Sequence, residues 1–401
     1  ALMRPGNVAS AVSLPEAFFL VTLMQRLEVP TGLLISHSGS YGAVSRAMLA
    51  GALLAIDEIN ADPTRKVSIN PVAIDPAGQI SGYVEGARKL IHEHRISHVM
   101  GCYTSSSRKE VLPLFEKADA LLWYPSHYEG FETSENVVYV GAAPNQHIVP
   151  LTQHLLTEFG LRGWMVGSNY IWAWENNRIL REALTASQGT VLGERYFTIG
   201  ETDFEAIVAQ IIADRPDFVF TTLIGQSGFV FLNLLRNACK AAGIEQSEEI
   251  PTASCSLSEA ELPLIGDAIE GHLSSSVYFS TVNSAENDRF IARWKAQFGG
   301  ETHASADAEN AYAAVHLLAK AAERAGSASF NDVRDAVRGL TFDAPQGRIK
   351  VDEENLHCWM RPRIGRSRAD GTFDIIQESP VAVRPDPYLT WSNDSLDVRG
   401  A

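Results

Sequence analysis

Three histidines around one glutamate are the most visible candidates for metal chemistry. The group consists of His92, Glu93, His94 and His98. Imidazole and carboxylate groups are ligands that zinc accepts. The spacing is not that of a His-Glu-x-x-His motif, because Ile96 stands where the second histidine would have to be. No cysteine or further carboxylate completes a ligand set nearby, so we interpret the group as a solvated helix end and expect no metal site.

Motifs for phosphate binding and for nucleophilic catalysis are missing from the sequence. There is no Gly-x-x-x-x-Gly-Lys-Ser/Thr loop and no Gly-x-Gly-x-x-Gly run after a strand. The run Gly225–Gly228 comes nearest to a nucleophile elbow but has the wrong spacing. No nucleophile and base stand out as a pair. We therefore expect a protein that is not an enzyme and needs no cofactor, with an amidohydrolase as the remote alternative.

The loops that follow the predicted strands are rich in aromatic and hydroxyl side chains. They are 36–42 (SHSGSYG), 102–107 (CYTSSS), 125–130 (PSHYEG), 168–175 (SNYIWAWE), 223–228 (LIGQSG) and 256–258 (SLS). Hydroxyls both donate and accept hydrogen bonds, so such loops suit a small, neutral, polar ligand. A phosphate or carboxylate would call for Arg or Lys, and only Arg108 and Lys109 lie close, at the start of a helix. Trp172 and Trp174 are separated by a single residue, and we expect one of them to lie at the lip or the surface.

A repeated strand–helix pattern positions these loops. Apolar, strand-like runs alternate with helical periodicity from Thr31 to about residue 143, and a second series follows Pro144. Two of the expected helices are Arg108–Lys117 and Glu175–Thr185. This alternation is typical of parallel sheets flanked by helices, with ligand sites beyond the carboxyl ends of the strands. The pattern predicts an α/β fold of two doubly wound lobes, with an amphipathic helix over Pro15–Gln25 ahead of them.

Composition and charge narrow the classes of function. The 401 residues suit two or three domains. With 33 Lys and Arg against 48 Asp and Glu, the net charge of −15 argues against a nucleic acid or an anionic membrane as partner. No apolar run reaches the ~20 residues of a membrane span. No signal-peptide cleavage pattern follows Met24, which favours a cytoplasmic location, and a periplasmic one stays open for a transporter component.

One long stretch resembles a known family. Residues 101–146 (GCYTSSSRKEV to VGAAPNQ), 167–177 (GSNYIWAWENN), 343–357 and 384–388 are similar to two kinds of protein. One is the amide-sensing negative regulator of the aliphatic amidase operon, and the other is the urea and short-chain-amide binding protein of ABC transporters. Both have the type I periplasmic-binding fold, within the branched-chain amino-acid binding-protein family. The resemblance covers about residues 31–388.

The resemblance implies two lobes joined by three crossovers. We expect the crossovers near Ala143–Gln146, Ser280–Asn283 and Ala344–Gly347. The implied division is an N-terminal extension of 1–30, a first lobe of 31–143 plus 281–344, and a second lobe of 144–280 plus 345–390.

The resemblance also implies a ligand in the cleft between the lobes. The implied contacts are Tyr103, Ser105, Tyr124 and Ser126 from the first lobe, Tyr170, Trp172 and Gly225 from the second, and Ser38 as a further candidate. The predicted function is a non-enzymatic clamp that closes around a short-chain amide, urea or a similar solute. It would act as a ligand sensor or as the substrate-binding protein of an ABC transporter. The partner would be an ABC permease or a cytoplasmic regulatory protein, and a homodimer stays open.

A branched-chain amino-acid binding protein is the alternative. Amino-acid binders of this family use an acid for the α-ammonium group, and Glu259 is a candidate for that role.

Overall fold

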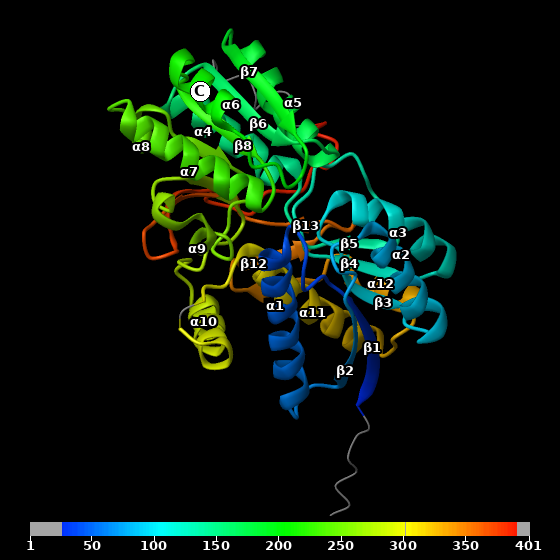
Figure 1. Cartoon of the computed structure of the whole chain (residues 1–401). Coiled ribbons are helices and arrows are strands. Elements are labelled where there is room, and N and C mark those ends of the chain that lie inside the picture. Colours follow the sequence, from blue (N-terminus) through cyan, green and yellow to red (C-terminus); the bar gives the residue numbers. More distant parts are fainter. Residues whose placement is uncertain (1–25, 301, 391–401) are drawn as a thin grey trace, which may run out of the picture.

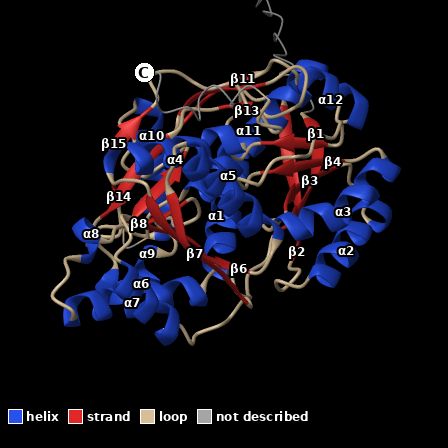
Figure 2. Ribbon diagram, turned by 90° about the horizontal axis from the view of Figure 1, so that it is seen from above, coloured by secondary structure: helices blue, strands red, loops and turns tan. Residues whose placement is uncertain are grey.

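The structure, a computed structural model, describes residues 26–300 and 302–390. It has two lobes, each built on a sheet of mainly parallel strands (Figure 1). Helices cover both faces of the sheets (Figure 2). The predicted helix over Pro15–Gln25 lies outside the described residues. Within them, no helix is both long and apolar enough to cross a membrane.

The first lobe has a five-stranded parallel sheet in the order β2-β1-β3-β4-β5. Its strands are β1 Leu27–Leu34, β2 Val67–Ile74, β3 His98–Gly101, β4 Leu121–Tyr124 and β5 Val137–Tyr139. Its helices are α1 Gly42–Ala61, α2 Ile80–Arg88 with a π turn at Lys89–Glu93, α3 Ser105–Ala118, α10 Ala285–Phe298, α11 Ala306–Ala325 and α12 Phe330–Val337. Successive strand residues face opposite sides, so Leu33 packs with α1 and α11 while Leu34 packs with α2 and α3.

The second lobe has a seven-stranded sheet in the order β15-β14-β10-β9-β8-β6-β7. Its strands are β6 Arg162–Ser168, β7 Thr190–Phe197, β8 Phe218–Thr222, β9 Thr252–Ser254, β10 Leu273–Ser276, β14 Arg363–Ser367 and β15 Phe373–Glu378. Its helices are α4 Ile148–Glu158, α5 Ile171–Ala186, α6 Glu205–Asp214, α7 Gln226–Ala241, α8 Gln246–Glu249 and α9 Leu262–Ile265. The antiparallel pairs in this sheet are β10 with β14 and β14 with β15. The two sheets confirm the predicted α/β architecture.

Residues 344–347, where we expected the third crossover, do not cross between the lobes. Residues 344–347 form the turn of a hairpin between β11 Thr341–Ala344 and β12 Gly347–Val351, which β13 Cys358–Trp359 joins. Ile349, Val351 and Leu356 pack into the core of the first lobe. The chain enters the second sheet only at Arg363. Apolar side chains in the segment 347–360 thus hold it on the first lobe, although we expected it in the second.

Three element boundaries also differ from the expectation. Strand β1 begins at Leu27, because Val29 is buried and Leu27 pairs with Val67, so residues 27–30 belong to the sheet and not to an extension. Helix α3 begins at Ser105, where the side chain of Thr104 caps it by accepting a hydrogen bond from the backbone N–H of Ser107. Helix α5 begins at Ile171 and therefore includes both tryptophans.

Candidate functional site

A cavity lies between the lobes. It is lined by Tyr103, Ser105, His127, Tyr170, Trp172, Leu223, Ile224, Ser256 and Glu261. Tyr103, Ser105 and His127 come from the first lobe, and the others come from the second. The walls combine aromatic rings with a few polar groups, which is the usual make-up of a small-molecule site. Four predicted site residues therefore meet in one place: Tyr103, Ser105, Tyr170 and Trp172.

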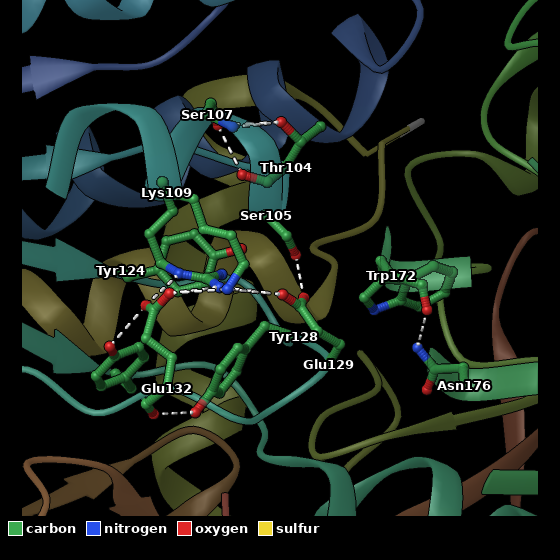
Figure 3. Close-up of polar contacts among 12 residues, drawn as sticks. Thr104, Ser105, Ser107, Lys109, Tyr124, Tyr128, Glu129, Glu132, Trp172 and Asn176 are labelled. Carbon is green, nitrogen blue, oxygen red and sulfur yellow. Dashed lines mark hydrogen bonds and ion pairs between the residues drawn. The ribbon is translucent and has the colours of Figure 1, made fainter. Parts of the chain in front are cut away.

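The first-lobe wall is held by the segment between β3 and α3. The Ser105 hydroxyl donates a hydrogen bond to the carboxylate of Glu129 (Figure 3). The ring of Tyr103 lies 5.2 Å from that of Tyr41. The Tyr124 hydroxyl donates to the backbone carbonyl of Tyr103 at 2.7 Å. Tyr124 is fully buried and does not line the cavity, so it supports the wall that we expected it to form.

A buried arginine stands behind this wall. Arg108 has 0% of its surface exposed, and its Nε lies 2.7 Å from Glu132. Its guanidinium lies 4.7 Å from the ring centres of Tyr124 and Tyr128. Although burial opposes the shift, this guanidinium lowers the pKa of Glu132 to about 2. The positive charge of Arg108 is therefore neutralised inside the lobe and is not presented to the cavity.

The second-lobe wall is formed by the start of α5. Trp172 is 3% exposed, and its indole Nε1–H has no hydrogen-bond partner within the described residues. Trp174 is 44% exposed, and its Nε1–H donates to Asn169. Residues two apart on a helix point about 200° apart, which explains why only one indole faces inward. The expectation that one of the two lies at the surface is confirmed.

His127 completes the wall from the loop after β4. Its ring lies 5.4 Å from that of Trp172 and 5.5 Å from that of His147. Burial, with a smaller effect of His147, lowers the pKa of His127 to about 3, so the imidazole is neutral at neutral pH. The neighbouring Ser126 does not line the cavity, and it donates a hydrogen bond to Asp307 at 3.2 Å. Ser126 was the predicted contact, but it is His127 that lines the cavity.

One acidic side chain lines the cavity. Burial and the nearby carboxyl of Asp307 raise the pKa of Glu261 to about 8, and the backbone N–H of Ser258 partly offsets this. Burial also raises the pKa of Asp307 to about 7, against the hydrogen bond from Ser126. Glu259, the acid considered from the sequence, instead accepts a hydrogen bond from the backbone N–H of Ser280 at 2.6 Å, in a crossover.

The remaining two predicted residues lie outside this cavity. Gly225, the residue before α7, lines an adjoining cavity of the second lobe and has a φ of +56°. Ser38 is exposed in the loop between β1 and α1. Leu223, Ile224 and Ser256 lie in loops that the sequence marked, but nothing in their residue types distinguished them from their neighbours.

The histidine group around Glu93 does not form a ligand set. His98 is buried, and its Nε2 lies 3.0 Å from the carbonyl oxygen of Ala328. His92 and His94 are exposed on the π turn and just after it. Among residues 26–300 and 302–390, no three His, Cys, Asp or Glu side chains gather as a metal site.

Comparisons with known proteins agree with this architecture. A family model described as periplasmic binding protein domain matches residues 29–394. The Leu/Ile/Val-binding protein homolog 6 of Brucella abortus is 22% identical over 342 residues, which is 82% of this chain and 85% of that protein. A limonene hydroxylase of Geobacillus stearothermophilus is 31% identical over 120 residues, but these are 30% of this chain and 22% of that protein.

Two solved structures show the same fold. The solute-binding protein of an ABC transporter from Rhodopseudomonas palustris HaA2, in complex with p-hydroxybenzoic acid, has a TM-score of 0.80 at 20% identity. The match covers 91% of this chain and all of that one. A leucine-binding protein from Thermotoga maritima has a TM-score of 0.76 at 17% identity, covering 87% and 98%.

Proposed function

The chain belongs to the periplasmic binding protein domain family, and on that premise we propose that it is a solute-binding protein of the ABC-transporter type whose cleft takes a small, neutral amide or urea. The lobes would close around the ligand by shifting an equilibrium between open and closed forms. The bound solute would be hidden from water, since its contacts come from both lobes.

The observation that carries this proposal is the unpartnered indole N–H of Trp172 in the wall of the cleft. A buried donor without an acceptor costs about 1–3 kcal/mol. An amide carbonyl would accept this hydrogen bond. The amide NH₂ group would find acceptors in the hydroxyl of Ser256 and the carboxyl of Glu261. A neutral amide therefore matches both ends of the polar lining.

The charges around the cleft favour a neutral ligand over an anion. No lysine or arginine lines the cavity, and Arg108 is paired with Glu129 and Glu132 behind the wall. A carboxylate would be buried close to Glu261 without a cation to offset it, which is costly. The raised pKa of Glu261 also disfavours a cationic ligand, because this carboxyl is largely uncharged at neutral pH.

A branched-chain amino acid is the second candidate. Glu261 could accept hydrogen bonds from an α-ammonium group once it is ionised, and this position, unlike that of Glu259, lines the cavity. Relatives with Leu/Ile/Val-binding in their names match most of the chain in sequence alignment. The two candidates differ in the charge that the ligand brings to Glu261.

We further propose that the protein is not an amidohydrolase. The hydroxyl of Ser105 donates to a glutamate that is itself paired with Arg108. No histidine within the described residues hydrogen-bonds to this serine, so the pair lacks the base that activates a nucleophile. Ammonia released from acetamide during incubation would contradict this.

The partner that recognises the closed form, an ABC permease or a regulatory protein, stays a prediction. The location of the protein and a homodimer also stay predictions.

Calorimetric titration with acetamide, urea and leucine, side by side, tests the proposed function. We expect saturable heat with at least one of the two amides and none with leucine. Heat with leucine alone would favour the second candidate and remove the first.

A further inference from the structure

A second cavity lies inside the second lobe beside the cleft. Leu223, Ser256 and Glu261 line both cavities. The two spaces therefore share one wall, and that wall carries the carboxyl and hydroxyl groups proposed to bind the polar head of the ligand.

The walls of this second cavity are mainly apolar, and four of its polar side chains are paired with one another. The apolar residues are Leu223, Phe229, Leu232, Ala253, Leu257 and Leu273. The hydroxyl of Thr252 lies 2.5 Å from the Nδ1 of His272. The hydroxyls of Ser254 and Ser256 lie 3.1 Å apart. A cavity lined mainly by apolar side chains favours hydrocarbon over water.

This cavity extends to the contact between the lobes. Gly225 lines the cavity, and the carbonyl of Ser40 from the first lobe lies directly against it. Closing the lobes would thus cover the apolar space and the polar cleft together.

We propose that the second cavity takes a hydrocarbon substituent of the solute whose amide head binds in the cleft. This inference rests on the proposed function and narrows it: the solute class is a primary amide with an alkyl or aryl group larger than methyl. An amide head group hydrogen-bonded to Glu261 or Ser256 would lie at the shared wall. The hydrocarbon substituent of the amide would then lie directly beside the apolar space.

The test is calorimetric titration of the full chain with acetamide, propionamide, butyramide and benzamide. Burial of each methylene is expected to tighten binding about fourfold until the cavity is filled. The variant Leu232→Phe, which adds volume to this wall, should reduce the gain for butyramide and leave acetamide unchanged. Leu235→Phe is the matched control, because it makes the same change on α7 at a buried residue that does not line the cavity.

The variant Leu257→Ala provides a second measurement if Leu232→Phe does not fold. It enlarges the cavity and should move the tightest-binding amide to a longer chain. Affinity that stays flat or falls from acetamide to butyramide, with acetamide still binding, would overturn this inference and leave the proposed function standing. Equal losses in Leu232→Phe and Leu235→Phe would also overturn it. If none of the amides binds, the proposed function fails and the inference fails with it.

Discussion

The backbone carbonyl of Ser40 lies so close to the α-carbon of Gly225 that a Cβ there would overlap its oxygen. Ser40 belongs to the loop between β1 and α1, and Gly225 precedes α7, so the two lobes touch at this point. The φ of +56° at Gly225 is also one that L side chains rarely adopt. Both facts require glycine when the lobes are together.

Gly225→Ala should therefore oppose closure. Its Cβ would displace the Ser40 loop, so we expect at least a tenfold loss of amide affinity and a larger radius of gyration by small-angle scattering with ligand present. Gly243→Ala is the control, because it shares the positive φ (+70°) but has open space around it. Equal losses of affinity in the two variants would mean that backbone strain, and not the contact with Ser40, causes the effect.

Trp172→Phe should weaken amide binding about fivefold to tenfold. The change keeps an aromatic ring in the wall and removes the Nε1–H, and one hydrogen bond is worth about 1 kcal/mol net. Trp174→Phe, on the exposed side of α5, should leave affinity unchanged. Calorimetry gives the affinities and thermal unfolding verifies the fold. Unchanged affinity in Trp172→Phe would remove this indole from the ligand site.

The pH dependence of binding should distinguish a neutral ligand from a cationic one. The pKa of Glu261 in the folded protein is about 8, above its ordinary value. Amide affinity should stay level from pH 6 to pH 7 and fall as the pH rises through 8, because ionised Glu261 makes closure more costly. An ammonium ligand needs the ionised form, so its affinity should rise over the same range. In Glu261→Gln the fall should disappear, and a fall that persists would assign it to another group.

Arg108→Met should destabilise the fold strongly. Removing a buried partner leaves Glu129 and Glu132 uncompensated, which typically costs 3–5 kcal/mol. Lys109, 3.1 Å from Glu132, offsets part of this, so we expect a loss of about 3 kcal/mol in the free energy of unfolding by urea. The control Arg178→Met removes half-exposed pairs with Glu175 and Glu182 and should cost less than about 1 kcal/mol. A loss that small in Arg108→Met would contradict the buried ion-pair network.

The sheets and the loops that build the cleft could be predicted from the sequence, because strand–helix alternation leaves a regular pattern of apolar residues. It was less informative about which side chain in a loop faces the ligand. Ser126 and His127 are neighbours in the loop after β4, and the partner of Ser126, Asp307 on α11, is distant in the sequence.

Two other features depend on contacts distant in sequence. Glu261 stands three residues beyond the marked loop 256–258, and no pattern linked it to Tyr103. The third crossover was expected at Ala344–Gly347 from the family resemblance. The apolar residues after it, Ile349 and Val351, keep the chain on the first lobe.

A crystal structure of the protein grown with excess acetamide would show directly whether the cleft binds an amide. We predict electron density for one amide between the lobes, its oxygen within hydrogen-bond distance of the Nε1 of Trp172 and its nitrogen facing Glu261 or Ser256. An empty cleft at saturating acetamide, or an amide bound away from Trp172, would contradict it.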